Sequence, residues 1–470
     1  MHVSNHGRLW QQVRFLQRQF LQDGELPFRD ILSKEVVLQA LTAAEVVWKE
    51  RIYSPVVTLW IFLGQVLSAD HSCRLAVARF NAHRLARGQS KCSSETSAYC
   101  QSRKRLPEKF FSTVATLVGR KLDDRAKSDW LWKGRRVYLF DGSTVSMPDT
   151  PANQEAFPQH DAQKPGRGFP MARIAAIFSL SCGAIIDLGI CRYAGKGQGE
   201  LSIFYQLIDM FRSGDVVLAD RLYGTWRGLV LLQSRGVHAV SQLQIMRTAD
   251  FRKGKRLGKG DHIVKWFKPS YIRSLDWKTQ RSLPESIRVR ECRVVVRQAG
   301  FRAKVIVVVT TMLDPKECTR EDLAELYLQR WNAELDLRSI KTTMQMEVLR
   351  CKTPELVRKE IWTHVLAYNL IRTIMAQAAD SHRVVPRTIS FKATMQTLEA
   401  FQPLVSYEAH CKPQLRREIH GRMLDCIAAH TVGDRPGRVE PRQIKRRPKR
   451  YQWMMVSRHE AKRQILKGLA

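Results

Sequence analysis

The chain has 470 residues and a mass of 54.2 kDa, about three times a typical domain, so two to four domains are expected. Its hydrophobic content of 44% excludes wholesale disorder. Lys and Arg residues number 78 against 44 Asp and Glu residues, which gives a formal net charge of +34. An excess of that size indicates a protein that binds a polyanion.

Membrane, secretory and disulfide-rich classes find no support in the sequence. The longest apolar runs, at 174–186 and 305–309, are shorter than the ~18–20 residues of a membrane span. The N-terminus carries no apolar core of a signal peptide. The ten cysteines form no C-x-x-C pair, so neither a disulfide framework nor a structural zinc site is expected, and a reducing compartment fits.

Residues 1–125 have helical spacing, for example at 56–67, 74–85 and 93–105. The last two segments flank a turn that contains Gly88, which is compatible with a helix-turn-helix DNA reader. Ordinary helical packing explains the pattern about as well. If the segment 93–105 does read DNA, Gln101 and Arg103 are the candidates for contacts to base edges.

Short apolar runs typical of buried strands begin near residue 135, and helical spacing separates some of them. The expected strands are 137–140, 174–180, 184–190, 216–219 and 237–241, and the expected helices are 199–211 and 225–235. This order predicts an α/β sheet with a mixed edge.

Residues 245–312 break that order. The segment alternates between polar and apolar residues, and between 250 and 304 it holds 16 Lys and Arg residues against 5 Asp and Glu residues. It therefore reads as a β-rich insertion with one charged face. Helical spacing returns at 320–344 and 354–379. The stretch 435–450 has eight basic residues and three prolines, and we expect it to be extended and solvated.

Four polar residues share one face of the helix expected after Pro315. Tyr327, Arg330, Glu334 and Lys341 follow one another at spacings of three, four and seven residues, which places them within about 60° on an ideal helix. Such a stripe is either a solvated salt-bridge ladder or a functional surface, and spacing alone does not separate the two readings.

Two aspartates follow apolar strands and favour the functional reading. Asp141 comes directly after the strand 137–140, and Asp220 directly after the strand 216–219. Carboxylates at the carboxyl ends of neighbouring strands point into the cleft where ligands bind. A single aspartate there is usually a turn or cap residue. Two of them with Glu334 in a basic chain favour metal-dependent phosphodiester chemistry, for which oxygen ligands suit Mg²⁺ or Mn²⁺.

The spacing Tyr327-x2-Arg330-x3-Glu334-x6-Lys341 resembles the Y-x2-R-x3-E-x6-K signature of one branch of the DDE insertion-sequence transposases. The flanking segments 326–331 and 368–372 resemble that family too. The segments 141–143 and 220–223 look like its other two acidic motifs. The resemblance covers roughly residues 50 to 450.

This resemblance implies an α/β, RNase H-like catalytic core in which Asp141, Asp220 and Glu334 bind two Mg²⁺ ions, with Mn²⁺ as an alternative. Tyr327, Arg330 and Lys341 would hold the phosphates of double-stranded DNA at the element ends. The family's reaction is end nicking, hairpin formation, hairpin opening and strand transfer into target DNA. A homodimer on DNA, a bacterial cytoplasmic and nucleoid-associated location, and no nucleotide cofactor are also implied.

The same resemblance divides the chain. The expected parts are a helical DNA-end-binding domain at 1–125, a catalytic core at 126–244 and 313–350 around the insertion at 245–312, a helical region at 351–430, and a basic tail at 431–470. Hairpin formation unstacks bases, so Trp266 or Trp277 of the insertion is expected to stack an extruded base.

Two other functions stay open on the sequence. One is a catalytically silent DNA-binding inhibitor of transposition, and the other is a stand-alone RNase H-like nuclease. The glycine-rich segment 195–199 is not a phosphate loop, because it lacks the G-x4-G-K-[ST] pattern. Glu200, an extra carboxylate near the expected sheet, is expected to be structural.

Overall fold

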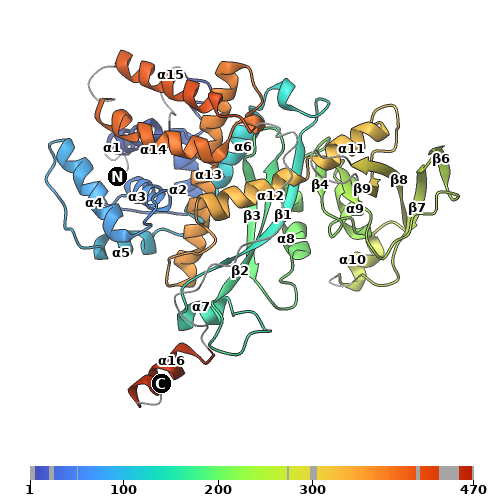
Figure 1. Ribbon diagram of the computed structural model, residues 1–470, viewed down its shortest axis with the longest axis horizontal. Helices are drawn as coiled ribbons and strands as arrows, with labels where there is room; N and C mark the ends of the chain where they lie inside the picture. Colours follow the sequence, from blue (N-terminus) through green and yellow to red (C-terminus); the bar gives the residue numbers. More distant parts are fainter. Residues whose placement is uncertain are drawn as a thin grey trace.

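The computed structural model of the chain describes residues 6–20, 26–49, 51–272, 275–296, 304–408, 413–432 and 455–467. An all-helical segment comes first, a mixed α/β segment follows, and long helices end the chain (Figure 1). None of the helices in these residues combines the length and hydropathy that a bilayer span needs. The basic stretch 435–450 lies outside the described residues.

The N-terminal helices begin at hydroxyl caps. The side chains of Ser33, Ser54 and Ser72 each accept a hydrogen bond from the backbone N–H three residues later, which satisfies a free donor of the first turn. The segment expected to be helical from residue 93 becomes helical only at Ser97. The elements are α1 (His6–Gln19), α2 (Lys34–Ala43), α3 (Pro55–Val66), α4 (Cys73–Ala86), α5 (Ser97–Arg105), α6 (Glu108–Asp124) and the 3₁₀ turn η1 (Ser128–Trp130).

The mixed segment supplies the nine strands of the described sheet. They are β1 (Val137–Ser146), β2 (Met171–Ser179), β3 (Ile185–Arg192), β4 (Val216–Ala219), β5 (His238–Gln242), β6 (Lys255–Gly258), β7 (Asp261–Phe267), β8 (Ser286–Val296) and β9 (Lys304–Thr310). Between them lie α7 (Pro151–Ala156), α8 (Glu200–Leu207), η2 (Ile208–Met210), α9 (Trp226–Gln233) and α10 (Trp277–Ser282).

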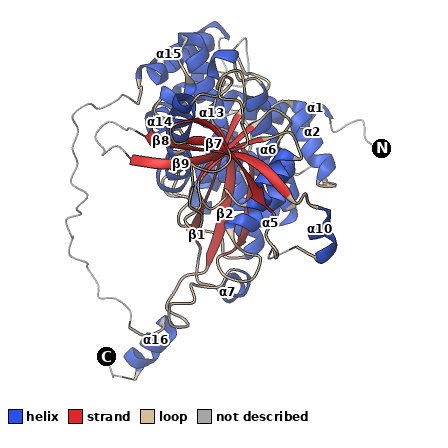
Figure 2. Cartoon of the chain, turned by 90° about the vertical axis from the view of Figure 1, so that its right-hand side faces the viewer, coloured by secondary structure: helices blue, strands red, loops and turns tan. Residues whose placement is uncertain are grey.

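The strand order is β3-β2-β1-β4-β5-β9-β8-β7-β6. Strands β1 to β3 are antiparallel, whereas β1, β4 and β5 run parallel. This is the arrangement of an RNase H-like sheet, so the expected α/β fold class is confirmed. The strands fan out in Figure 2 because each one is twisted relative to its neighbour.

Strand β1 is longer than its apolar run. Residues 142–146 keep pairing with β2 after the pairing with β4 has ended at Phe140. Asp141 therefore lies inside a strand and not at its end, contrary to our expectation. The hairpin partner β2 holds this polar half of β1 in register, which the apolar pattern alone does not reveal.

The strands of the segment 245–312 are not a separate sheet. Strand β9 pairs antiparallel with β5, and β8, β7 and β6 follow outward from it. Their sheet is thus continuous with the sheet of the core, and Figure 1 shows these strands and α10 extending to the right.

The helix expected at 320–344 is interrupted twice. It forms α11 (Arg320–Leu328), α12 (Trp331–Arg338) and one π-helical turn, η3 (Ser339–Thr343). Around residues 329–333 the backbone N–H groups bond three residues back, as in a 3₁₀ helix. The stripe therefore does not lie on one regular helix. The remaining elements are α13 (Pro354–His382), η4 (Pro386–Thr388), α14 (Phe391–Glu408), α15 (Pro413–Ala429) and α16 (Arg458–Leu466).

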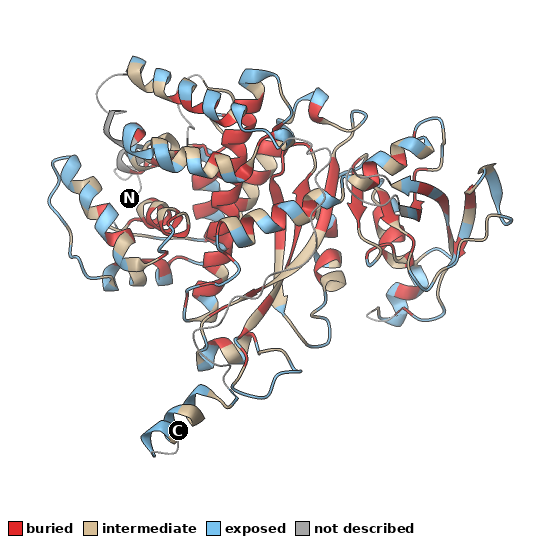
Figure 3. Cartoon of the chain, viewed as in Figure 1, coloured by how far each residue is buried: buried red, intermediate tan, exposed pale blue. Residues whose placement is uncertain are grey.

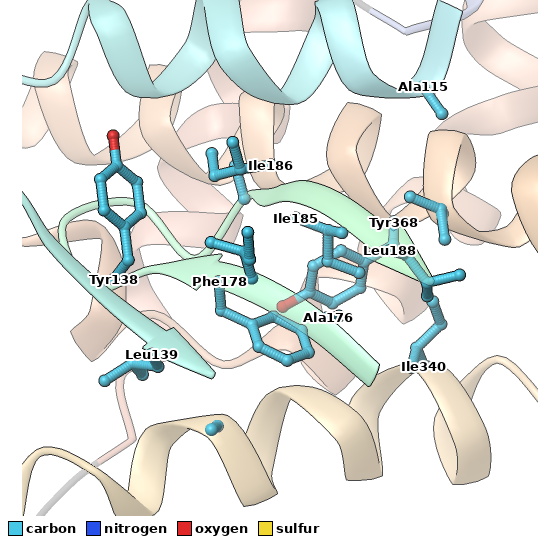
Figure 4. Packing of buried hydrophobic residues seen from close by; sticks show 14 of the residues in the cluster. Ala115, Tyr138, Leu139, Ala176, Phe178, Ile185, Ile186, Leu188, Ile340 and Tyr368 are labelled. Atoms are coloured by element: carbon cyan, nitrogen blue, oxygen red, sulfur yellow. The ribbon is translucent and has the colours of Figure 1, made fainter. Parts of the chain in front are cut away.

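Helix α13 is the centre of the molecule, and nearly all its residues are buried (Figure 3). The Asn369 amide donates to the carbonyls of Ala115 and Ile185 and accepts from the Ile185 N–H, so it joins α13 to α6 and β3. A Cβ at Gly119 would come within 2.0 Å of the Ile185 carbonyl oxygen, so only glycine permits this contact. Figure 4 shows the core, with strands β1 to β3 between Ala115 and Ile340.

Candidate active site

The register of two parallel strands brings Asp141 and Asp220 together. Phe140 of β1 and Ala219 of β4 are the last paired residues of these strands. Asp141 and Asp220 are the next residues on each strand, so they lie side by side where β4 ends. Each carboxylate accepts a hydrogen bond from the following backbone N–H, at 2.9 Å from Gly142 and 2.6 Å from Arg221.

Helix α12 supplies the third carboxylate and packs against β1. Glu334 lies in its first turn, and its Oε1 is 2.9 Å from the Nη2 of Arg330. The Glu334 side chain is 39% exposed. The buried Asp336 anchors this helix, because its carboxylate accepts from Arg372 and from Arg387, the latter at 2.6 Å.

The electrostatics couple these groups. Burial raises the pKa of Asp141 to about 6, and the charges of Glu334 and Glu200 act in the same direction. The Gly142 N–H and the Arg330 guanidinium act against this rise. Burial would lower the pKa of Arg330, but its bond to Glu334 and the charge of Asp220 keep that pKa raised. The charges of these carboxylates therefore act on one another, and a bound cation would stabilise their ionised forms.

The other members of the Tyr327–Lys341 stripe reach different parts of this centre. The buried Tyr327 hydroxyl donates to Gln242 at 3.3 Å, and burial raises its pKa to about 12. The Lys341 ammonium donates to the Ser143 hydroxyl of β1 at 2.9 Å. Both cations of the stripe thus lie around the carboxylates, where they can contact phosphate oxygens.

Glu200, which we expected to be structural, lies in the same centre. It opens α8, and its Oε2 accepts from the Tyr223 hydroxyl at 2.9 Å while its Oε1 pairs with Arg173 at 3.2 Å. A Cβ at Gly142 would meet the Cδ of Glu200 at 2.6 Å. The carboxylate therefore packs on the strand of Asp141 and bonds to the segment of Asp220. The glycine beside Asp141 is a sequence signal that some group approaches β1 closely there, but it does not identify Glu200 as that group.

Two of the residues expected to contact DNA are buried, so the structure contradicts those expectations. Arg103 is only 4% exposed and lies among cysteine sulfurs and aromatic rings, so it cannot reach a base edge, whereas Gln101 is exposed on α5. Trp266 is 4% exposed and its Nε1 donates to Glu291 at 2.8 Å. It packs inside the insertion and has no face free for a base. Trp277 is 72% exposed at the start of α10.

The donor chemistry of the centre fits a hard divalent cation. Asp141, Asp220 and Glu334 offer oxygen atoms only, which are the ligands of Mg²⁺ and Mn²⁺. Across the described residues, no three His, Cys, Asp or Glu side chains stand close enough to hold a metal ion as they are placed. The pairing of Glu334 with Arg330 is one physical reason for this arrangement.

Comparisons with known proteins find transposases. The chain is 26% identical over 427 residues to the transposase InsG for insertion sequence element IS4 of Escherichia coli (strain K12), covering 90% of this chain and 92% of the relative. It is 33% identical over 277 residues to the putative transposase InsL for element IS186A of the same organism, covering 56% of this chain and 72% of the relative.

A cryo-EM structure of the piggyBac transposase synaptic complex with hairpin DNA aligns with 88% of this chain and 85% of its own, at 10% identity and a TM-score of 0.43. The family model described as "Transposase DDE domain" matches residues 132–370, a span that includes Asp141, Asp220 and Glu334. Because this match covers more than half of the sequence, the chain belongs to the DDE transposase family and is an insertion-sequence transposase.

Proposed function

We propose that the protein excises its element through metal-dependent nicking and hairpin formation at the ends, followed by strand transfer. The observation that carries the proposal is that Asp141 and Asp220 meet at the end of the β1–β4 pairing, and that the helix of Glu334 packs against β1. Two divalent ions held by these carboxylates would activate the attacking oxygen and stabilise the leaving oxygen.

The side chains around the carboxylates account for the rest of the chemistry. Arg330 and Lys341 supply charge for the phosphates on both sides of the cut, and the Tyr327 hydroxyl offers a further donor. DNA binding follows from the family, and the net charge of +34 favours it. With Trp266 buried, Trp277 is the candidate to stack an extruded base.

Assembly and location remain part of the proposal. Bringing two ends together favours a homodimer on DNA in the bacterial cytoplasm, near the chromosome. An interface in the helices of 354–430 would use α14 and α15, because α13 is already covered by the chain itself.

The test is cleavage of a duplex that carries the inverted repeats flanking the gene. We expect Asp141→Asn, Asp220→Asn and Glu334→Gln each to abolish nicking and joining in Mg²⁺ while end binding persists, because the basic surface is unchanged. The exposed Glu321→Gln of α11 is the matched control and should cleave normally.

Each alternative predicts a different result. A silent inhibitor would bind ends without a metal-dependent cut, and a stand-alone nuclease would cut without a joined product. Near-normal cleavage by any of the three carboxylate variants would remove that residue from the metal site.

A further inference from the structure

Three cysteines from distant parts of the chain surround one guanidinium outside the active site. Cys73 opens α4, Cys100 lies in α5, and Cys351 precedes α13. The Arg103 Nη2 is 3.3 Å from the Cys73 sulfur and 3.5 Å from the Cys100 sulfur, and its Nη1 is 3.8 Å from the Cys351 sulfur. The sulfurs of Cys73 and Cys100 are 4.0 Å apart.

This guanidinium is buried without a carboxylate partner. Its Cζ lies 4.7 Å from the centroid of the Tyr99 ring and 4.8 Å from that of Phe62, and among the described residues no carboxylate forms an ion pair with it. The buried Glu360 carboxylate instead accepts from the backbone N–H groups of Arg350 and Cys351. Arg103 also donates to the Gln65 oxygen at 3.5 Å and interacts with the charge of Glu360 without a hydrogen bond to it. Burying a cation is costly, so the three sulfurs in contact with the guanidinium favour an anionic form.

The two neighbouring thiols differ in character. The hydrogen bond with Cys73 and then the charge of Arg103 lower the pKa of Cys100 to about 5, although burial acts the other way. The bond with Cys100 and burial raise the pKa of Cys73. Cys100 is partly exposed, whereas Cys351 is buried. Cys73 is partly exposed as well, so two accessible sulfurs lie beside one guanidinium, and the lowered pKa makes Cys100 the more reactive of the two. This is the arrangement of a reactive cysteine with a resolving partner.

We propose that Cys100 and Cys73 form a peroxide-reactive thiol pair, a modification site separate from the DNA-cleaving centre. The Cys100 thiolate attacks hydrogen peroxide, and with one proton this gives a sulfenic acid and water. The Cys73 thiol then attacks the Cys100 sulfur, forming the disulfide and releasing a second water. The two sulfurs together lose two electrons, and the peroxide is reduced to two waters.

The reaction would change the packing of α5. A disulfide needs a sulfur–sulfur distance of about 2.05 Å, so the two sulfurs must approach from 4.0 Å. Oxidation also removes the anionic partner of the Arg103 guanidinium. The backbone carbonyl of the same residue accepts a hydrogen bond from the Lys359 ammonium at 3.1 Å, and this bond joins α5 to α13. Oxidation of this pair would therefore change the packing where α4, α5 and α13 meet.

The test uses the reduced full-length protein and hydrogen peroxide, followed by peptide mapping. We expect a disulfide-linked pair of peptides that contain Cys73 and Cys100, reversed by dithiothreitol. Cys73→Ser should leave a sulfenic acid on Cys100 that dimedone labels, and Cys100→Ser should abolish both products. Cys426→Ser, at an exposed cysteine of α15, is the matched control and should keep the linkage.

Alkylation provides a measurement that needs no variant to fold. At pH 6.5 iodoacetamide should modify Cys100 at least about tenfold faster than the exposed Cys426, because the thiolate is the reacting form. Equal rates, a linkage of Cys100 to Cys92 in place of Cys73, or no linkage in a protein with unchanged circular dichroism would each overturn the proposal.

Discussion

The Glu200 carboxylate accepts from the Tyr223 hydroxyl and lies against Gly142, so it touches both segments that carry Asp141 and Asp220. We predict that Glu200→Gln lowers the cleavage rate by about tenfold or more. A charge-assisted hydrogen bond contributes ~1.5–3 kcal/mol, and this change also removes the ion pair with Arg173. Cleavage should be measured against Mg²⁺ concentration, since the lost charge should raise the metal requirement.

Tyr223→Phe separates the two roles of Glu200. That variant removes only the hydroxyl, so it should disturb the Asp220 segment and leave the charge of the centre intact. An unchanged rate and an unchanged Mg²⁺ dependence in Glu200→Gln would show that this carboxylate serves the fold alone.

Asp141, Asp220 and Glu334 could be proposed from the sequence because their spacing and their strand neighbours are local signals. Glu200 could not be chosen, because its meeting with Gly142 depends on how α8 packs on the sheet. The predicted DNA contacts of Arg103 and Trp266 were wrong because both side chains are buried. A basic or aromatic residue in a polar segment looks exposed until its sulfur or carboxylate partners from other elements are known.

Helix α12 owes its position to a buried ion-pair network. Asp336 is 0% exposed and pairs with Arg372 of α13 and with Arg387. We predict that Asp336→Ala lowers the free energy of unfolding by about 3–5 kcal/mol, because it leaves two guanidinium groups without their partner. Urea unfolding measures this loss. The exposed Glu321→Ala of α11 should stay within about 0.5 kcal/mol of the parent protein.

Helix α13 carries a histidine that should make stability depend on pH. Burial lowers the pKa of His364 to about 4, and the same cause lowers that of the neighbouring His71. Between about pH 6.5 and 4 the unfolded chain then binds more protons than the folded one, so the free energy of unfolding decreases as the pH falls. His364→Phe should remove roughly 2–3 kcal/mol of the difference between pH 7 and pH 4.5.

Urea titrations at the two pH values check this prediction. The matched control is His459→Phe, at an exposed histidine of α16, which should retain the full pH dependence. If the free energy of unfolding changes equally with pH in the parent protein and in His364→Phe, groups other than His364 cause the pH dependence.

Apolar periodicity predicted which segments form helices and strands, but it did not predict where one helix ends and the next begins. Strand β4 coincides with its expected range, because an apolar run buried on both faces ends at Asp220. The break between α11 and α12 was not visible, since every residue of 327–334 is compatible with a helix. There α11 packs on β8 and α12 on β1, so tertiary contacts decide where the helix is interrupted.

At the scale of the whole molecule, the N-terminal helices and the catalytic sheet share one hydrophobic core. Residues of α1, α3 and α6 belong to the same buried cluster as α13 and β1. Removing residues 1–125 would therefore expose the central helix, and it is not a clean test of DNA recognition. Point variants on the exposed face of α5 are needed instead.

The last prediction concerns how the chain tells element ends from other DNA. Gln101 is exposed on α5 beside the exposed Lys104 and Arg105, so a base contact and phosphate contacts can come from one helix. Gln101→Ala should reduce the preference for the inverted repeats over random duplex by about 1–3 kcal/mol, with little change in salt dependence, since it removes no charge.

Lys104→Ala should weaken binding to both duplexes alike and lower the salt slope by about one unit, because it removes one phosphate contact. Lys462→Ala, at an exposed lysine of α16, is the control for charge alone. Titration of both duplexes at several salt concentrations separates these effects. If Gln101→Ala keeps full discrimination between the inverted repeats and random duplex, end recognition lies on a surface other than α5, and the exposed face of that helix binds the backbone only.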